Sequence, residues 1–264
     1  MVLAPPRTLS PTKVSAFTGC PLAFRFVNID RLPEPPSAPA VKGTLVHAAL
    51  EGLIWNHPAG QRDERAAMAE VASAWDAMRD TSEVVELGLD DEAAAAFVAD
   101  AEVLVRNYFQ LEDPDQVRAA GVELGLQIDL GGTVLRGIID RLDLDENGNL
   151  VVIDYKTGRA PAPRFEHGRL SGVHIYALLC EQMLGQAPVA VRLLYLRDPV
   201  SITAVPSQQS VRGQRRRTMA VWSAIERACA NDDFRPSPSG LCRSCNFQAY
   251  CPAFGGEPPV AGAS

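Results

Sequence analysis

Apolar residues in the second half of the chain either alternate with polar residues or form short continuous runs, and both patterns are typical of β-strands. They predict strands over residues 122–130, 134–144, 150–155, 189–196 and 200–205. Gly131 and Gly132 mark a turn between the first two strands, and Asn147 and Gly148 mark a second turn. The sequence therefore predicts a sheet whose first three strands form an antiparallel meander.

Segments with helical periodicity surround these strands. Ser10 and Pro11 predict the N-cap and first residue of a short helix that ends at Gly19, after loose residues 1–9. The proline-rich residues 32–39 predict a connector. Further helices are predicted from Gly43 onward, over the alanine-rich residues 61–111 with a break near Leu87 and Gly88, and over residues 170–184 and 208–231, whereas residues 158–168 form a loop.

Strands surrounded by helices predict an α/β or α+β fold around one mixed sheet. With 264 residues, 47% of them hydrophobic, the chain can bury a sizeable core. We expect a single domain over residues 1–264. Its predicted parts are N-terminal helices (10–60), an inserted helical lobe (61–115), the sheet core (120–206), and a long helix with a cysteine-rich loop (207–254).

The formal net charge of −7 argues against a surface that coats a polyanion as a whole, although a local basic channel remains compatible with it. The 25 basic residues comprise 22 arginines and three lysines, so Lys156 inside an apolar strand has a special role. No segment resembles a membrane span or a signal peptide, and we expect a cytoplasmic protein. Structural disulfides are rare there, so the six cysteines need another explanation.

The hairpin 137–158 carries the first candidate site, because it holds Asp140, Asp154 and Lys156 among apolar neighbours. Burying such charges is costly unless they pair or bind a metal. A two-residue turn would put Asp140 and Asp154 on opposite faces, whereas a three-residue loop (146–148) with left-handed Gly148 puts all three on one face. We predict the three-residue loop. Carboxylates with a nearby lysine suit Mg²⁺- or Mn²⁺-dependent phosphodiester hydrolysis, and an ion pair at a strand end is the alternative.

His47 and Glu51 lie one turn apart on a predicted helix, and a structural histidine is the simpler interpretation of the pattern. Glu123 lies in an alternating strand, where a solvent-facing position is expected. Arg212, Arg215, Arg216 and Arg217 begin a long helix, and Arg159, Arg164 and Arg169 lie in or near a loop. These arginines are candidates for phosphate contacts, with a solvated helix start as the alternative for the first group.

Cys242, Cys245 and Cys251 form a compact triplet, and Cys20 is available as a fourth thiolate. Four thiolates suit either a structural zinc ion or an iron–sulfur cluster, and the spacing does not separate the two. Cys180 and Cys229 fall within predicted helices and are expected to be buried apolar residues.

Together these motifs resemble the RecB-family nucleases of the PD-(D/E)XK superfamily, and more narrowly their iron–sulfur branch, which includes AddB-type nuclease domains and CRISPR adaptation nucleases. The matching segments follow the family order and span residues 10–251. They are Cys20-Pro21 with Phe24 and Phe26, GTLVHAALE around His47, GIIDRLD around Asp140, VVIDYKTG around Asp154 and Lys156, and the terminal cysteine triplet.

The resemblance implies a restriction-endonuclease-like core and a set of site residues. His47, Asp140 and Asp154 would bind Mg²⁺ or Mn²⁺ together with the carbonyl of Tyr155, and Lys156 would be the catalytic lysine. Glu123 is a weaker candidate. Tyr176 matches the tyrosine of a Gln-x3-Tyr motif whose glutamine is replaced by Gly172. The resemblance also implies a [4Fe–4S] cluster on Cys20, Cys242, Cys245 and Cys251, which would join the N- and C-terminal segments.

The implied activity is a metal-dependent DNA nuclease of repair or recombination, acting as an exonuclease on single strands or DNA ends. The chain has no room for a helicase motor, so a helicase would act in trans. Two alternatives are a catalytically weak iron–sulfur module that binds DNA ends, which the missing glutamine favours, and a zinc-stabilised interaction protein.

Overall fold

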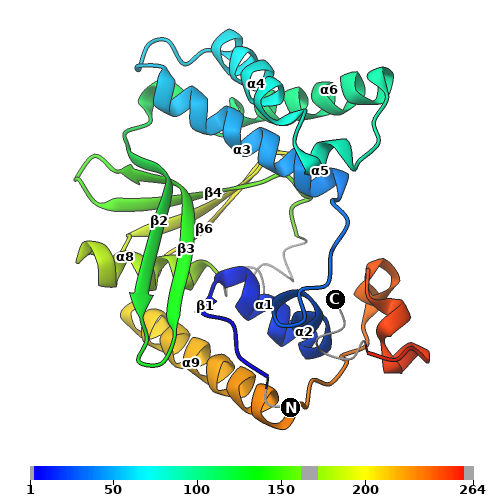
Figure 1. The fold of residues 1–264 in the computed structure, drawn as a ribbon. Coiled ribbons are helices and arrows are strands. Elements are labelled where there is room, and N and C mark those ends of the chain that lie inside the picture. Colours follow the sequence, from blue (N-terminus) through cyan, green and yellow to red (C-terminus); the bar gives the residue numbers. More distant parts are fainter. Residues whose placement is uncertain (1–2, 162–171, 259–264) are drawn as a thin grey trace. The chain divides into compact units, whose positions relative to one another are not determined.

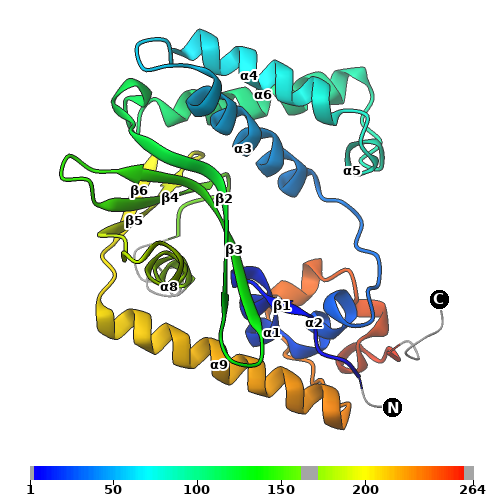
Figure 2. The ribbon, with the colours of Figure 1, turned by 60° about the vertical axis from the view of Figure 1, so that its left-hand side comes forward.

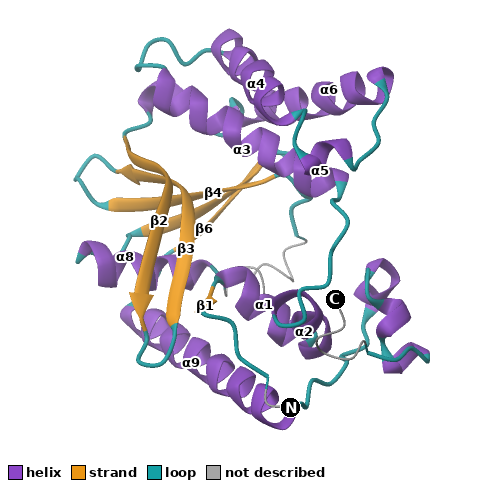
Figure 3. Ribbon diagram, viewed as in Figure 1, coloured by secondary structure: helices purple, strands orange, loops and turns teal. Residues whose placement is uncertain are grey.

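The computed structural model describes residues 3–161 and 172–258 (Figures 1 and 3). The chain forms two compact units. One, here called the sheet unit, comprises Pro36–Leu126 and Ile138–Gln208. The other, here called the cysteine unit, comprises Met1–Pro35, Gln127–Gly137 and Gln209–Ser264. The predicted division into a nuclease domain with an inserted lobe stays a prediction.

The sheet unit contains a mixed sheet, as predicted. Antiparallel pairing joins β3 to β4 and β5 to β6, whereas β4 and β5 are parallel, and β2 pairs with β3. The parallel pair needs a crossover, and the chain between those two strands contains the helix α8 (Val173–Leu184). The strands are β2 (Ala119–Asp129), β3 (Val134–Leu144), β4 (Leu150–Lys156), β5 (Ala190–Tyr195) and β6 (Val200–Ala204).

A helical layer covers one face of this sheet, and α8 lies on the other (Figures 1 and 2). The layer comprises α3 (Ala38–Asn56), α4 (Glu64–Met78), α5 (Ser82–Val85) and α6 (Asp91–Tyr108), followed by a 3₁₀ turn (Pro114–Gln116). The predicted break near Gly88 is confirmed, because this glycine is left-handed (φ 64°) between α5 and α6.

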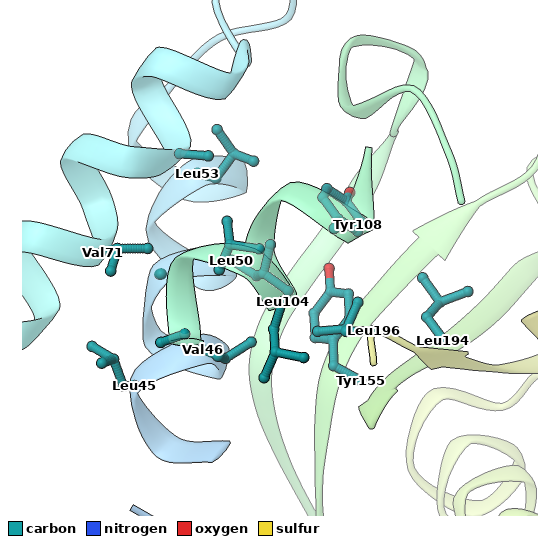
Figure 4. Close-up of a cluster of buried hydrophobic side chains, with 14 of the residues drawn as sticks. Leu45, Val46, Leu50, Leu53, Val71, Leu104, Tyr108, Tyr155, Leu194 and Leu196 are labelled. Carbon is teal, nitrogen blue, oxygen red and sulfur yellow. The ribbon is translucent and has the colours of Figure 1, made fainter. Parts of the chain in front are cut away.

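The core of the sheet unit lies between this helical layer and the strands (Figure 4). Leu45, Leu50 and Leu53 on α3 are fully buried and pack in one cluster with Tyr108 and Tyr155. The predicted start of α3 near Gly43 is wrong, because the helix begins five residues earlier at Ala38. Ser37 caps it, and Pro39 is tolerated in the first turn, where backbone N–H groups need no helical partner.

The cysteine unit contains β1 (Thr8–Leu9), α1 (Pro11–Gly19), α2 (Pro21–Asn28), all but the first residue of α9 (Gln208–Asn231), and three 3₁₀ turns (Gly240–Ser244, Gln248–Tyr250, Pro252–Phe254). The predicted α1 is confirmed, with Ser10 as its N-cap. The prediction of a loose N-terminus is wrong for residues 3–9. The N–H of Leu3 donates to the carbonyl of Cys229 (3.2 Å), and β1 pairs in parallel with the start of β3.

The sequence analysis did not predict α2. This helix starts at Pro21, directly after α1 ends, and it buries Leu22, Phe24 and Phe26. Proline at the first position sets the backbone for a new helix, which explains how two helices can follow one another with only Cys20 between them. In the described ranges 3–161 and 172–258, none of the helices combines the length and the apolar character needed to cross a membrane.

Candidate active site

The turn of the β3–β4 hairpin has the predicted three-residue loop. The N–H of Asp145 donates to the carbonyl of Asn149 (2.9 Å), which closes the loop 146–148, and Gly148 is left-handed (φ 79°). The register of β3 and β4 pairs Arg141 with Ile153. One further step along this ladder sets Asp140 opposite Asp154, so the two carboxylates share a face of the sheet.

Asp154 and Lys156 form an ion pair on that face. Asp154 is buried, and the hydroxyl of Tyr176 on α8 donates to its Oδ1 (3.3 Å). Burial opposes the charge on Lys156, but the carboxylates of Asp154 and Asp140 outweigh it and raise the pKa of the amine. Lys156 is therefore a cation that can stabilise negative charge, not a base.

Asp140 is held by the neighbouring strand, because the main-chain N–H of Tyr155 donates to its Oδ2 (2.7 Å). That hydrogen bond favours the ionised carboxyl, yet burial and the nearby charge of Asp154 raise the pKa of Asp140 to about 7. Two carboxylates this close repel one another when both are ionised. A divalent cation at this position would remove the repulsion.

His47 on α3 reaches the same place. Its Nε2 donates to the carbonyl of Tyr155 (3.1 Å), and its Nδ1 lies 3.6 Å from Oδ2 of Asp140. Because Nε2 carries the proton in this contact, Nδ1 presents its lone pair toward Asp140. Burial lowers the pKa of His47, so the imidazole is neutral and can act as a metal ligand.

Glu123 on β2 completes a group of three potential ligands. One ligand atom each of His47, Glu123 and Asp140 lies within 4.8 Å of the others. Exposed and less exposed residues alternate along β2 from Val122 onward, as expected, but Glu123 adopts a left-handed backbone (φ 44°), which was not expected. The residue as a whole is exposed, as expected, but its carboxyl group is partly buried. This partial burial and the charge of Asp140 raise the pKa of Glu123.

This donor set fits a small divalent cation. Ligands on opposite sides of an octahedral Mg²⁺ are about 4.2 Å apart, so the three groups would need to move only a little to bind one ion. Two carboxylates and a neutral imidazole also match the ligand types of Mg²⁺ and Mn²⁺. Asp154, a predicted ligand, is engaged by Lys156 and Tyr176, and the carbonyl of Tyr155 accepts from His47. Their roles as metal ligands stay predictions.

The four predicted cluster cysteines all belong to the cysteine unit and line one pocket of about 350 Å³ that is partly open to solvent. Phe26 and Phe247 also line this pocket. In the part of the chain that the structure describes, which includes Cys20, Cys242, Cys245 and Cys251, no three sulfurs lie within 4.8 Å of one another. Cys180 and Cys229 are buried, as expected, and burial raises the pKa of Cys180 to about 12.

The predicted phosphate-binding arginines are exposed where the structure describes them. Arg212, Arg215 and Arg216 lie on the solvent side of α9, and Arg159 follows β4. Arg164 and Arg169 lie outside the described residues. The sequence analysis overlooked Arg141, a fully buried arginine on β3. Its signal was available, since a basic residue two positions before Asp143 in an apolar strand needs a partner.

Comparison with known proteins agrees with this geometry. The model of the PD-(D/E)XK nuclease superfamily matches residues 8–252. Gene 69 protein of Mycobacterium phage D29 is 24% identical over 93% of this chain and 96% of its own length, and Gene 69 protein of Mycobacterium phage L5 is 24% identical over 96% and 98%.

A solved structure from Eubacterium rectale, named "Putative exonuclease", has a TM-score of 0.60 at 11% identity and covers 91% of this chain and 88% of that one. At this identity the likeness concerns the fold alone, and it is consistent with a restriction-endonuclease-like arrangement of sheet and helices. Nucleases of this superfamily use divalent metals, which agrees with the His47, Glu123 and Asp140 group. Because the family model spans nearly the whole chain, the protein belongs to the PD-(D/E)XK nuclease superfamily.

Proposed function

We propose that this protein is a metal-dependent deoxyribonuclease that acts as an exonuclease on single-stranded DNA or DNA ends in repair or recombination. The observation that carries the proposal is the convergence of His47, Glu123 and Asp140 next to the Asp154–Lys156 pair. The name of the structurally similar protein from Eubacterium rectale supports exonucleolytic action.

Each residue of the site has a role that follows from its charge. His47, Glu123 and Asp140 hold the ion, with Asp154 and the carbonyl of Tyr155 as further ligands. A bound Mg²⁺ or Mn²⁺ supplies an activated water at neutral pH and neutralises the phosphate. Lys156 stabilises the charge that develops on the phosphate, because the neighbouring carboxylates keep it protonated. Tyr176 orients Asp154 through its hydroxyl.

Cleavage of end-labelled single-stranded DNA with Mn²⁺ tests the proposal. Lys156→Ala should lower the rate at least about 100-fold, as for the loss of one group that stabilises transition-state charge. Lys42→Ala is the matched control, because Lys42 pairs on the surface with the exposed Asp100. This variant should cleave DNA at the wild-type rate. Circular single strands should resist cleavage if the action is exonucleolytic. Equal rates for Lys156→Ala and wild type would contradict the proposal.

We also propose that Cys20, Cys242, Cys245 and Cys251 hold a [4Fe–4S] cluster. Around a tetrahedral zinc ion the sulfurs stand ~3.8 Å apart, because Zn–S bonds are about 2.3 Å long. Sulfurs that bind separate irons of a cube stand farther apart. What supports a shared group is that all four cysteines line one pocket. Backbone N–H groups donate to two of the sulfurs, Ser237 to Cys20 (3.4 Å) and Ser239 to Cys242 (3.3 Å), a contact that tunes such clusters.

Anaerobic purification with iron and sulfide analysis tests this cluster. Wild type and Cys229→Ala should hold iron and sulfide in equal amounts, whereas Cys20→Ser should lose most of both. Cys229 is the matched control because it lies in the same unit but is buried in α9. A colourless protein with stoichiometric zinc would contradict the cluster and favour the zinc alternative.

We further propose that DNA contacts the start of α9. The cysteine unit carries 12 of the 25 basic residues but only 7 of the 32 acidic ones. The excess of acidic over basic residues in the chain therefore lies in the sheet unit. Among described residues, Arg212, Arg215 and Arg216 have no carboxylate within ion-pair distance, and α9 has no acidic residue in its first turn. Positive charge without neighbouring carboxylates on an exposed helix surface supports an anionic partner.

A further inference from the structure

Arg141 is fully buried and all five of its N–H groups have a partner. Nε and Nη2 donate to the two oxygens of Asp143 (2.8 Å each), and Nη2 also contacts Glu112 (2.6 Å). Nη1 donates to the hydroxyls of Tyr108 (2.9 Å) and Tyr155 (2.7 Å). A buried charge with complete hydrogen bonding holds its partners in one geometry, because any displacement leaves a donor unsatisfied.

Tyr155 links this buried network to the candidate metal site. Its side chain packs beside Tyr108 in the core (Figure 4), with the ring centroids 5.8 Å apart. Its main chain contacts two candidate ligands on the other side, since the N–H donates to Asp140 (2.7 Å) and the carbonyl accepts from His47 (3.1 Å). A shift of the Tyr155 backbone would therefore move both ligands together.

We propose that Arg141 and the hydroxyl of Tyr155 act as positioning residues for the metal site. The inference rests on the proposed function, because it takes His47 and Asp140 as metal ligands. Arg141 follows Asp140 directly, so its side chain points to the opposite face of β3 and does not contact the ion. Its effect reaches the site through the ring and the main chain of Tyr155.

The alternative is a purely structural role, in which the network stabilises the core without setting the site. The two tyrosines separate these possibilities. The hydroxyls of Tyr108 and Tyr155 both accept a hydrogen bond from Nη1 of Arg141, but only Tyr155 contacts His47 and Asp140. Removing either hydroxyl leaves one N–H of Arg141 without its partner, and removing that of Tyr108 also takes a donor from Glu112 (2.7 Å). The Tyr108 defect is therefore at least as large, but only the Tyr155 defect lies beside the ligands.

The experiment compares Tyr155→Phe with Tyr108→Phe and measures Mn²⁺ affinity by electron paramagnetic resonance, without DNA. Replacing a group that holds a metal ligand in place typically lowers the metal affinity 10- to 100-fold. We expect the dissociation constant to rise about 10-fold in Tyr155→Phe and to stay within about twofold of wild type in Tyr108→Phe. Thermal unfolding should show a loss of stability in Tyr108→Phe at least as large as in Tyr155→Phe, because Tyr108 also donates to Glu112.

Equal Mn²⁺ affinities in the two variants would overturn the inference and leave a structural role. If Tyr155→Phe folds poorly, Arg141→Lys provides a second variant, which keeps the charge but loses the planar guanidinium. It should also weaken Mn²⁺ binding more than Tyr108→Phe does. Failure of the proposed function is a different outcome. If His47→Ala binds Mn²⁺ as tightly as wild type does, the proposed metal site itself is wrong, whatever the tyrosine variants show.

Discussion

The main-chain N–H of Tyr155 lies 2.7 Å from Oδ2 of Asp140, which ties this carboxylate to the strand that carries Asp154 and Lys156. One hydrogen bond does not offset the cost of its charge, because burial and Asp154 raise the pKa of Asp140 to about 7. Ionised Asp140 is therefore a source of instability that a bound divalent cation would relieve.

Asp140→Asn should stabilise the metal-free protein at pH 8. The amide keeps an oxygen that can accept from Tyr155 but removes the buried charge, so the free energy of unfolding should rise by about 1–3 kcal/mol. The variant should also lose Mn²⁺ binding and cleavage. Urea unfolding in EDTA measures the first effect, and titration with Mn²⁺ measures the second.

Asp145→Asn is the control for that variant. Asp145 lies half-buried in the same hairpin, where hydrogen bonds from Asn149 and Asn147 lower its pKa and stabilise the ionised form. Its replacement should lower stability at pH 8 and leave Mn²⁺ affinity unchanged. A metal-free Asp140→Asn variant that is less stable than wild type would contradict the raised pKa.

The raised pKa of Asp140 should also determine how the stability of the metal-free protein changes with pH. Asp140 is protonated in the folded state up to about pH 7 but ionises near pH 4 when unfolded, so its favourable contribution is present below pH 4 and is lost as pH rises to 7. Relative to Asp140→Asn, the metal-free wild type should lose up to about 1.4 kcal/mol per pH unit across that window. Above pH 7 the difference should be constant.

Mn²⁺ affinity should change with pH in the opposite direction. Protons compete with the ion for Asp140, so the affinity should rise by about tenfold per pH unit below pH 7 and level off above it. Calorimetry in buffers of different ionisation enthalpy should detect proton release below pH 7. Affinity independent of pH between 5.5 and 7 would mean that Asp140 does not bind the ion.

Local rules predicted the two strands of the hairpin and the glycine turn between them, but the three-residue loop was predicted because one shared metal site needs it. The left-handed Gly148 and the period of two along β3 and β4 together set the register that brings Asp140 opposite Asp154. The same rules predicted α9 to the residue, since its buried positions recur with the helical period and no proline interrupts it. The PD-(D/E)XK family followed from the motifs around Cys20, His47, Asp140 and Asp154 and from the terminal cysteines.

Other features depend on contacts between distant parts of the chain. The short strand β1 has only two residues and exists because β3 offers it a partner more than a hundred residues later. Glu123 joins His47 and Asp140 because its backbone leaves the regular strand conformation. Alternation predicted a solvent-facing residue, and no pattern near position 123 signals the left-handed turn of the chain.

Glu123→Gly and Glu123→Ala should separate the backbone of this residue from its carboxylate. A left-handed backbone costs a residue with a Cβ about 1–2 kcal/mol, whereas glycine adopts it freely. We therefore expect the glycine variant to be more stable than the alanine variant by about 1 kcal/mol. Both variants should lose Mn²⁺ affinity to the same extent. Unchanged Mn²⁺ affinity in both would remove Glu123 from the ligand set.

Arg25 should join the N- and C-terminal segments of the cysteine unit even without a cluster. It pairs with Asp30 (3.0 Å) and with Asp232 at the end of α9 (2.7 Å), and its side chain is only 10% exposed. Arg25→Ala leaves buried Asp30 unpaired, so the free energy of unfolding should fall by about 3 kcal/mol. Urea unfolding with and without iron should give the same loss.

Arg235→Ala provides the contrast for Arg25. Arg235 also pairs with an aspartate, but its side chain is 83% exposed, so its loss should lower the stability far less than the loss of Arg25. Equal losses in the two variants would show that the Arg25 contacts do not hold the segments together. A loss for Arg25→Ala that appears only after iron removal would assign that role to the cluster instead.

The start of α9 should bind DNA through charge alone. Arg212 and Arg216 lie one turn apart, and like charges at this spacing repel unless an anion lies between them. Replacing both by alanine should weaken single-stranded DNA binding and reduce the slope of log affinity against log salt by about 1.4, because each phosphate contact contributes ~0.7. The unfolding free energy should not fall, since the two side chains have no carboxylate partner among the described residues.

The matched control replaces Arg79 and Arg106 by alanine, which changes the net charge by the same amount. Arg106 pairs with Glu64 and Glu102 (2.9 Å each), and Arg79 lies 3.6 Å from Asp76, so neighbouring carboxylates already neutralise both. Their loss should leave the salt dependence of DNA binding unchanged. If both double variants lower the slope equally, the effect comes from net charge, and the arginines of α9 are a solvated helix start and not a binding surface.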